Sequence, residues 1–328
     1  RETPALEPVN EISVNPWVII GKSEKMRKIF KMMGLVCNSR VNVLLQGETG
    51  TGKELIARVI HLNSSFKDEP FVVFDSSAVV ATLLESELFG HEKGAFTGAE
   101  TTKMGKIEQA GNGTLFLDEI AQLPLAIQGS LLGFLQRREY TRVGGSRTLK
   151  SKCRIIAACN CNLADKVNKG VFKEDLYYRL KVFMIEVPPL KERLSDTSLL
   201  VEHFLNKINR ELGTQVTKLQ DGVMEMLVNQ TWKGNVRELE NTIAQALVGC
   251  RGNVLLKDDI HKLLNAKNRS HKMGLESYSL AHVEKIHITN TLSQLQWNKT
   301  NSARLLGISL PTLRSKIKKY KIHKSDTQ

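Results

Sequence analysis

The residues best suited to chemistry form one short segment rich in glycine. It consists of Gly47, Glu48, Thr49, Gly50, Thr51, Gly52, Lys53 and Glu54. The glycines let backbone N–H groups point at phosphate oxygens, and Lys53 reaches the β- and γ-phosphates of a nucleotide. The apolar run 41–45 before the segment predicts a buried strand, and 54–60 has the apolar face of a helix. A ligand-free glycine turn is the alternative, but this order of strand, loop, lysine and helix favours a nucleotide site.

A second strand ends in two acidic residues, Asp118 and Glu119. Asp118 can hold Mg²⁺ through water, and Glu119 can polarise the water that attacks a phosphate. Acids after a strand are common, so this signal is specific only beside a phosphate loop. A third strand, 154–158, ends at Cys159-Asn160, where Asn160 can sense the γ-phosphate. Glu54 departs from most phosphate loops, which carry Ser or Thr there to bind magnesium.

Between these two halves of the site lies a loop of small residues with a single aromatic. Its members are Gly94, Ala95, Phe96, Thr97, Gly98 and Ala99. Two glycines give its backbone freedom, and we expect Phe96 to be exposed. A loop at this place can change shape with the nucleotide and push on a partner. In isolation, an ordinary surface loop is the alternative.

The elements that must position these residues follow from apolar periodicity. Apolar runs predict strands at 41–45, 113–118, 154–158 and 183–187. Strands that alternate with helices predict a three-layer α/β sandwich. After Pro188-Pro189 the pattern becomes helical, and it predicts helices at 199–212, 221–230, 235–249 and 258–265. These helices indicate a small helical lid.

The basic charge is concentrated near the C-terminus. Residues 267–324 hold 12 Lys and Arg against two acids, a balance of +10 out of the whole chain's +13. Such a patch is typical of nucleic-acid binding, and a solvated basic tail is the alternative. Residues 266–277 show no apolar period and predict a linker.

Residues 278–328 predict a helix-turn-helix domain. A first helix is expected over 280–295, with Val283, Ile286, Leu292 and Leu295 as candidate buried residues. A second runs from about 300 to 306 and ends at Gly307, and Ser309 can cap a third. Two short helices that are joined at a glycine are typical of this motif when the second helix has basic residues on its outer face. A three-helix bundle with a solvated basic face is the alternative.

The expected DNA contacts lie on the outer face of the third helix. Thr312, Arg314 and Ser315 are expected at base edges, and Lys316, Lys318, Lys319 and Lys321 at phosphates. Thr300, in the preceding helix, is a further expected contact. The inner stripe is Leu313, Ile317 and Tyr320.

Composition favours a cytoplasmic protein. The sequence has no apolar run long enough to span a bilayer and shows no signal peptide. Five cysteines without regular spacing predict reduced thiols, and Cys159-x-Cys161 is only a weak metal motif. Because the chain begins at Arg1 without a methionine, we expect residues 1–15 to be a linker stub that follows a missing N-terminal regulatory region.

Taken together, these motifs resemble the bacterial enhancer-binding proteins, the AAA+ activators of sigma-54 RNA polymerase. The resemblance runs from about Val18 to Leu264, and even Glu54 fits, since this family usually has Glu there. The segments that carry it are Glu85–His91, Gly94–Ala99, Gly113–Ile120, Phe172–Leu180, Val187–Leu190 and Trp232–Leu239. The C-terminal segment is similar to the Fis-type domain that commonly ends such activators.

The resemblance implies an AAA+ P-loop three-layer sandwich (16–190) with a helical lid (191–265), in which ATP lies between neighbouring subunits of a ring, usually a hexamer. Arg179 matches an arginine finger that reaches into the neighbour's site, and such fingers supply roughly 10³–10⁵ in rate in related enzymes. Arg237 matches the lid arginine that contacts nucleotide in its own subunit. Phe96 and Thr97 match the loop that grips sigma-54, and the Fis-type domain implies dimers on paired half-sites.

Several residues depart from the family pattern. Asp75 stands where Asn is usual, and its carboxylate is expected to repel Glu119 rather than donate a hydrogen bond to it. Lys173 replaces a common second arginine finger, and lysine is a point charge rather than a fork. Cys159 stands where Thr is usual in the sensor. We therefore expect an ATPase that is slower or differently gated than its relatives.

Two hypotheses follow. The first is an ATP- and Mg²⁺-dependent activator, often part of a two-component system, that binds double-stranded enhancer DNA and remodels the sigma-54 RNA polymerase closed complex. The second is a DNA-binding regulator with a vestigial ATPase that uses nucleotide only for assembly. The intact loop 94–99 and the pair Asp118-Glu119 favour the first, and Asp75 and Lys173 keep the second open.

Overall fold

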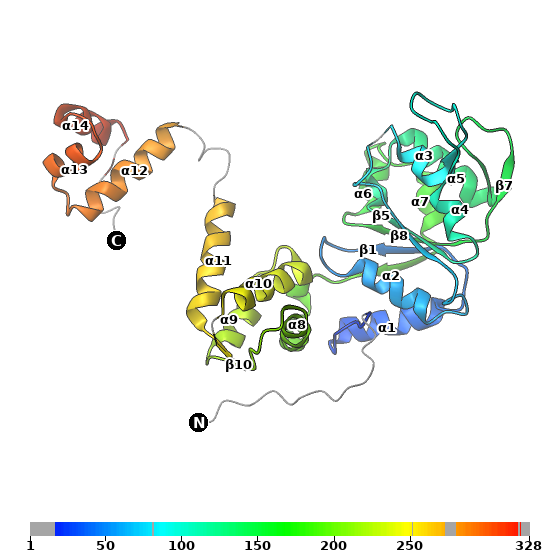
Figure 1. Cartoon of the computed structure of the whole chain (residues 1–328), viewed down its shortest axis with the longest axis horizontal. Helices are drawn as coiled ribbons and strands as arrows, with labels where there is room; N and C mark the ends of the chain where they lie inside the picture. Colours follow the sequence, from blue (N-terminus) through cyan, green and yellow to red (C-terminus); the bar gives the residue numbers. More distant parts are fainter. Residues whose placement is uncertain (1–16, 81, 251, 273–279, 321, 323–328) are drawn as a thin grey trace. The chain divides into compact units, whose positions relative to one another are not determined.

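The structure is a computed structural model that describes residues 17–80, 82–250, 252–272, 280–320 and 322. The chain forms two compact units, Arg1–Asp259 and Ile260–Gln328, and each is described by itself. Figure 1 shows the elements of both. The expected linker stub 1–15 and the second part of the expected linker, 273–277, lie outside the described residues.

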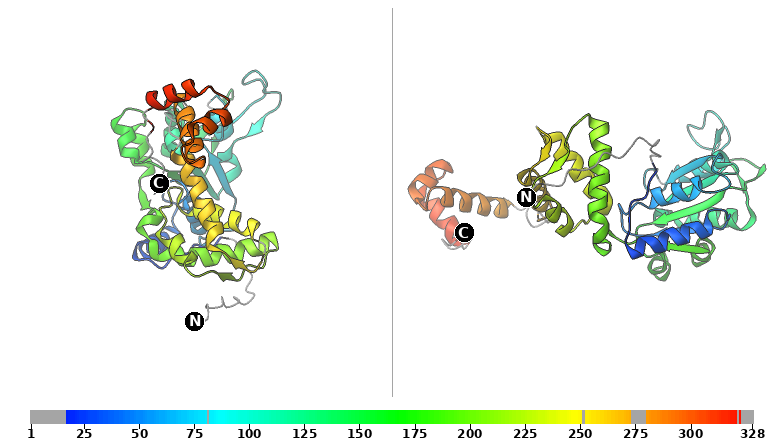
Figure 2. Two further views of the ribbon diagram at one scale, coloured as in Figure 1. Left: turned by 90° about the vertical axis from the view of Figure 1, so that its left-hand side faces the viewer. Right: turned by 90° about the horizontal axis from the view of Figure 1, so that it is seen from below.

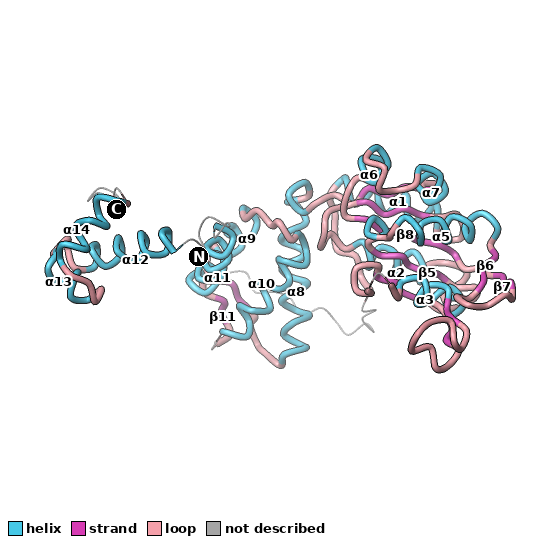
Figure 3. Tube along the Cα trace, turned by 90° about the horizontal axis from the view of Figure 1, so that it is seen from above, coloured by secondary structure: helices cyan, strands magenta, loops and turns pink. Residues whose placement is uncertain are grey.

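A five-stranded parallel sheet forms the centre of the first unit, and Figure 3 shows its strands side by side between helices. In spatial order the strands are β2 (Phe71–Asp75), β5 (Thr114–Asp118), β8 (Arg154–Cys159), β1 (Val43–Gln46) and β9 (Phe183–Glu186). Because every neighbouring pair is parallel, the carboxyl ends of all five strands meet at one edge of the sheet. The sequence predicted four of these strands and missed β2.

Helices cover both faces of the sheet, as the predicted three-layer sandwich requires. One face is covered by α1 (Glu24–Val36) and α2 (Lys53–Leu62). The other face carries α3 (Leu84–Phe89), α4 (Lys106–Ala110), α5 (Leu125–Arg137), α6 (Leu163–Asn168) and α7 (Glu174–Leu180). Successive residues of β1 serve the two cores alternately: Leu44 packs on the second side, and Val43 and Leu45 on the first.

Two short hairpins extend from this sandwich. The first pairs β3 (Gly90–His91) with β4 (Lys103–Met104), and the second pairs β6 (Glu139–Thr141) with β7 (Thr148–Lys150). A bridge between His91 and Val143 joins the two hairpins. The loop 94–99 is therefore part of the connection between β3 and β4 and lies beside the turn of the second hairpin. A short 3₁₀ turn, Ile120–Gln122, follows β5.

The rest of the first unit is the predicted helical lid. It is entered through two 3₁₀ turns, Leu190–Glu192 and Leu194–Asp196. Its further elements are α8 (Thr197–Leu212), β10 (Lys218–Leu219), α9 (Val223–Asn229), α10 (Asn235–Gly249) and β11 (Val254–Leu255). Helix α11 (Lys257–Lys272) begins at the end of this unit and continues beyond residue 265. Residues 266–272, expected to be linker, are helical, because the sequence has no Gly or Pro before Gly274 to end the helix.

The second unit contains most of α11 and, after it, a small domain of three helices. Figure 2 shows this domain in orange to red. Its helices are α12 (Leu280–Gln294), α13 (Lys299–Leu305) and α14 (Leu310–Lys319). Its core contains Ile288, Leu292, Ala303, Leu313 and Ile322. Of the four residues expected to be buried in the first helix, Leu292 is buried and Leu295 is half-buried, and the side chains of Val283 and Ile286 lie outside the description.

The turn between α13 and α14 follows the prediction. Gly307 has a φ of +66°, which a glycine adopts without strain. Ser309 precedes α14, and its hydroxyl accepts a hydrogen bond from the backbone N–H of Thr312. This is the predicted cap.

Candidate functional site

The phosphate loop leaves the carboxyl end of β1 and enters α2. Gly50 and Gly52 have φ values of +77° and +99°, a region that side chains rarely adopt. Lys53 is the first residue of α2 and is only 7% exposed. Its ammonium donates to the Gly47 carbonyl at 2.8 Å, so the positive charge lies inside the curve of the loop. Backbone N–H groups at a helix start, together with this charge, form an anion site.

The lid contacts the phosphate loop directly. A Cβ atom on Gly50 would lie 2.2 Å from the carbonyl oxygen of Gly234, so the two backbones approach each other as only glycine allows. The backbone N–H of Arg237 donates to the Gly50 carbonyl at 3.2 Å. Arg237 is an exposed residue, so a ligand can approach its side chain. Any ligand that reshapes the loop therefore acts on the lid as well.

Asn235 strengthens this contact and was missed by the sequence analysis. It is fully buried, and its amide group donates to the carboxylate of Glu48 and to the Thr49 carbonyl. Its amide oxygen accepts from the backbone N–H of Leu190, where the lid begins. Asn235 thus joins the loop, the entry to the lid and α10. The signal in the sequence was a Gly-Asn pair at the start of a predicted helix.

A buried arginine, also missed, supports the loop from beneath. Arg193 is 4% exposed and donates to the Thr51 carbonyl at 3.0 Å. Burial lowers the pKa of this guanidinium, and Asp196 opposes that effect. No local pattern in the sequence distinguishes Arg193 from a surface arginine.

Asp118 and Glu119 end β5 at the same edge of the sheet. Asp118 accepts a hydrogen bond from the backbone N–H of Glu119 at 2.9 Å. Glu119 has a φ of +50°, and one of its carboxylate oxygens is buried without a hydrogen-bond partner among the described residues. A buried carboxylate oxygen that accepts no hydrogen bond can take a proton from a water molecule. This is the chemistry predicted for Glu119.

The pKa values of both acids are raised. Burial is the main cause for each. The ammonium of Lys53 opposes the rise for Glu119, whereas the charges of Asp118 and Asp75 add to it. A base with a raised pKa holds an abstracted proton more firmly. The shift therefore makes Glu119 a stronger base when it is ionised, and it also raises the pH below which Glu119 is protonated and cannot act as a base.

Asp75 is the Cα partner of Asp118 on the neighbouring strand β2. One oxygen of its carboxylate accepts from the backbone N–H and the hydroxyl of Ser77, at 2.8 and 2.7 Å. Those bonds orient Asp75 within its own turn. Its charge still reaches Glu119, which agrees with the expected repulsion.

The sensor strand β8 also ends at this edge. The side-chain amide of Asn160 lies 3.4 Å from the hydroxyl of Thr49, so the structure places it against the phosphate loop. The carbonyl of Cys159 accepts from the backbone N–H of Gly47, and burial raises the pKa of its thiol to about 12. Cys159 is thus a neutral, structural side chain. In the described part of the chain no group of three or more His, Cys, Asp or Glu is suited to a metal, and Cys159 and Cys161 are free thiols.

Arg179 lies at the opposite edge of the sheet, where the amino end of β1 is. The side chain of Asn42, just before β1, donates to the Arg179 carbonyl at 2.8 Å. The residue is exposed, and its guanidinium donates to the Leu135 carbonyl at 3.3 Å. Arg179 also lines a cavity of about 210 Å³ with Arg40, Arg138 and other residues. The phosphate loop follows the other end of β1, about 13 Å away along its four residues. The structure therefore does not bring Arg179 into its own chain's nucleotide site.

Lys173 stands at the start of α7. Its backbone N–H donates to the side chain of Gln128 at 2.8 Å, and its own side chain is exposed. Like Arg179, it faces outward rather than toward Lys53.

The loop 94–99 is ordered by its own hydrogen bonds. Gly94 N–H donates to the Ala99 carbonyl at 2.9 Å, and Ala99 N–H donates to the Phe96 carbonyl at 3.0 Å. The Phe96 side chain is 37% exposed, as expected for the aromatic residue, but its ring also contacts His91. At the base of the loop, Arg142 forms ion pairs with Glu92 and Glu108.

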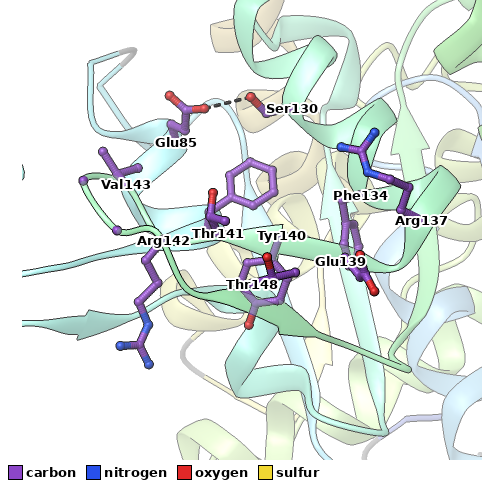
Figure 4. A pocket seen from close by; sticks show the side chains of 13 residues that line it. Glu85, Ser130, Phe134, Arg137, Glu139, Tyr140, Thr141, Arg142, Val143 and Thr148 are labelled. Atoms are coloured by element: carbon purple, nitrogen blue, oxygen red, sulfur yellow. Dashed lines mark hydrogen bonds between the residues drawn. The ribbon is translucent and has the colours of Figure 1, made fainter.

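A cavity of about 490 Å³ lies near this loop rather than at the phosphate loop. It is bordered by α3, α5 and the β6–β7 hairpin. Figure 4 shows Glu85 hydrogen-bonded to Ser130 at its rim, while the side chain of Arg142 extends away from them. The lining includes the turn residues Gly144 and Gly145.

In the second unit, the outer face of α14 carries most of the expected DNA contacts. Thr312, Arg314, Ser315, Lys318 and Lys319 are exposed, as is Thr300 in α13. Lys316 differs from the prediction: it is half-buried and forms an ion pair with Glu284 of α12. The hydroxyl of Tyr320 donates to the same carboxylate. The ion pair with α12 makes Lys316 less available than its neighbours on α14, and its contact with a phosphate stays a prediction. Lys321 lies outside the described residues.

Known protein families match segments of both units. Residues 19–186 match the sigma-54 interaction domain, 191–276 the AAA+ ATPase lid domain, and 279–320 the bacterial regulatory protein, Fis family. Regulatory protein AtoC of Escherichia coli (strain K12) is 42% identical over 94% of this chain and 68% of its own length. DNA-binding transcriptional regulator NtrC of Klebsiella pneumoniae is 38% identical over 97% and 72%.

The chain belongs to the sigma-54-dependent transcriptional activators. Its fold agrees, since the crystal structure of NtrX from Brucella abortus in complex with ADP superposes with a TM-score of 0.77 at 29% identity, covering 94% of this chain and 70% of that one. The chain spans between about half and three quarters of the length of its curated relatives. None of the helices that the structure describes has the length and apolar character needed to cross a membrane.

Proposed function

We propose that this sigma-54 activator is a ring-forming ATPase that binds enhancer DNA and uses ATP hydrolysis to remodel the sigma-54 RNA polymerase closed complex to the open complex. One observation carries the proposal: beside Asp118 and Lys53, Glu119 has a buried carboxylate oxygen that finds no hydrogen-bond partner in the described part of the chain. This is a base positioned next to a phosphate loop, and binding without hydrolysis has no use for it.

The nucleotide is ATP, held by 47–54 and contacted by Asn160 and Arg237. The relative NtrX has been crystallised with ADP and with ATP. Mg²⁺ fits the donor set, because Asp118 offers a carboxylate oxygen that accepts one backbone hydrogen bond, from Glu119, and its oxygens are the kind of ligand that Mg²⁺ prefers. Glu54 is less available to the ion, since Arg58 binds its carboxylate at 2.7 Å. The metal would neutralise phosphate charge, while Glu119 orients and deprotonates the water.

Hydrolysis requires a second subunit in this proposal. Arg179 lies at the sheet edge remote from its own phosphate loop, so its guanidinium serves the nucleotide of a neighbour. Lys173, exposed on the same helix, adds a positive charge to that junction. The sites then complete one another around a ring, a hexamer or heptamer, and the Fis-type domains pair as dimers.

The partners follow from two exposed parts of the chain. The loop 94–99 contacts sigma-54, and the exposed face of α14 contacts double-stranded enhancer DNA, with Thr300, Thr312, Arg314 and Ser315 nearest the bases. The protein works in the cytoplasm, as part of a two-component system. The domain boundaries proposed from the sequence remain 16–190, 191–265 and 278–328.

A DNA-binding regulator with an attenuated ATPase is the second candidate. The charge of Asp75 favours it, because this charge adds to the rise in the pKa of Glu119 and so increases the fraction of Glu119 that is protonated and unable to act as a base. Steady-state ATP turnover decides between the two when it is measured over a range of protein concentrations. The activator account predicts turnover per subunit that rises with concentration and disappears in Glu119→Gln. Nucleotide binding without turnover at any concentration would favour the second candidate.

A further inference from the structure

We propose that His91 is a positioning residue that holds the loop 94–99 folded against its own base by binding the ring of Phe96. The inference rests on the proposed contact between this loop and sigma-54. It adds what restrains the loop before it meets that partner.

The contact between the two rings is direct. Their centroids are 5.0 Å apart, and their planes meet at 66° in an edge-to-face arrangement. Aromatic pairs favour this geometry over face-to-face stacking. Because His91 covers part of Phe96, the ring that is expected to meet a partner rests on its own chain.

His91 is itself firmly placed. It is 8% exposed, and its Nδ1 atom lies 2.7 Å from the hydroxyl of Ser86 in α3. Its neighbour Glu92 donates a backbone hydrogen bond to the Val143 carbonyl. The imidazole therefore belongs to the hydrogen-bonded base of the hairpin, and Phe96 to the loop that the proposal expects to be released.

The turn of the second hairpin holds the other side of the loop. A Cβ atom on Gly144 would lie 2.7 Å from the Cβ of Ala95, and Gly144 has a φ of +73°. Only glycine allows so close an approach. Two neighbouring loop residues are thus held in place. Ala95 lies against Gly144 of the second hairpin, and Phe96 lies against His91.

The consequence concerns the equilibrium between a folded and a released loop. For Phe96 to insert into a partner, the ring contact with His91 must break. Removing the imidazole should raise the released population, whatever nucleotide is bound.

Chymotrypsin measures this population, because it cleaves after phenylalanine and needs an extended, accessible chain. When opening is fast relative to cleavage, the rate of cutting at Phe96–Thr97 follows the fraction of released loop. The full chain is digested under native conditions, and this cut is identified by the mass of its products.

The variants are His91→Ala, His91→Phe and a matched control, His61→Ala. His61 is also a buried imidazole bonded to a hydroxyl, that of Thr114, and it packs on Phe71 in the same unit. We expect His91→Ala to speed cleavage at Phe96 roughly two- to tenfold, the worth of one aromatic pair. His91→Phe should restore most of the protection, since it keeps a ring, and His61→Ala should leave the rate unchanged.

An unchanged rate in His91→Ala would overturn the proposal. So would equal acceleration in His61→Ala, which would signal general loosening, or in His91→Phe, which would exclude the ring contact. Binding of sigma-54 holoenzyme without nucleotide is a separate measurement. If His91→Ala speeds cleavage but does not strengthen that binding, the restraint by His91 stands and the proposed role of the loop in binding sigma-54 fails.

Discussion

Asp75 and Asp118 are Cα partners at the carboxyl ends of neighbouring parallel strands. Two like charges therefore stand at the entrance to the site where Glu119 is the proposed base. The pKa of Glu119 is raised chiefly by burial, and the charge of Asp75 adds to the rise. In this activator the residue on β2 thus influences the proton affinity of the base without touching it.

Replacing Asp75 with Asn should move the acidic limb of the ATPase pH profile to lower pH. Removal of a negative charge makes Glu119 easier to ionise, so its pKa falls and the base remains active in more acidic solution. The check is kcat measured from acidic to neutral pH. Asp68→Asn, an exposed acid elsewhere on the same subunit, is the control. A limb that stays in place in Asp75→Asn would show that Asp75 does not affect the base.

Arg179→Ala and Glu119→Gln should restore activity to each other when mixed. Each variant alone should lose about 10³-fold or more in turnover, because one lacks the finger and the other the base. Since Arg179 lies away from its own phosphate loop, a mixed ring contains junctions with both groups intact, about a quarter of all junctions for random assembly. A mixture as inactive as its components would mean that the finger acts within its own subunit, or not at all.

Lys173→Arg should raise turnover and leave nucleotide affinity nearly unchanged. An arginine presents a planar fork to the spread charge of the phosphoryl transition state, and a lysine presents a single point. Lys169→Arg, exposed in the preceding turn, makes the same chemical change without reaching a junction. Equal kcat values for Lys173→Arg and the parent chain would remove this lysine from the catalytic account.

The lysines of α14 should differ in their effect on DNA binding. Lys318→Ala should reduce the slope of log affinity against log salt by about 1, because an exposed ammonium meets one phosphate. Lys316→Ala should reduce it less, since Glu284 already pairs with Lys316. Glu284→Gln should strengthen binding and steepen the slope by freeing that charge. Equal slopes for the two lysine variants would show that the ion pair opens on DNA.

Local sequence patterns predicted much of this fold. The glycine loop, the acid pair after β5 and the turn at Gly307 each carry their signal within a few residues. The missed helix α1 also had one, since Met26, Ile29, Met33 and Val36 are spaced on one face after the capping Ser23. The missed strand β2 is an outermost strand of the sheet, and Phe74 is the one buried residue among its five. Its apolar pattern is therefore a weaker signal than that of the central strands.

Other features depend on contacts between distant segments and have no local signal. Asn235 meets Glu48 only because the lid folds back on the phosphate loop. Lys316 is paired because α12 and α14 pack together, which no property of α14 alone reveals. The order of the strands in the sheet, with β2 beside β5 and β1 between β8 and β9, is likewise set by tertiary packing.

Promoter opening is the most direct test of the central claim that ATP hydrolysis acts through the loop 94–99. Open complexes formed by sigma-54 holoenzyme on a promoter with enhancer DNA are counted with ATP, for the parent chain and for Thr97→Ala. The account predicts ATP-dependent opening by the parent chain and loss of opening in Thr97→Ala, with ATP turnover retained. Full opening by Thr97→Ala, or opening by the parent chain without hydrolysis, would contradict it.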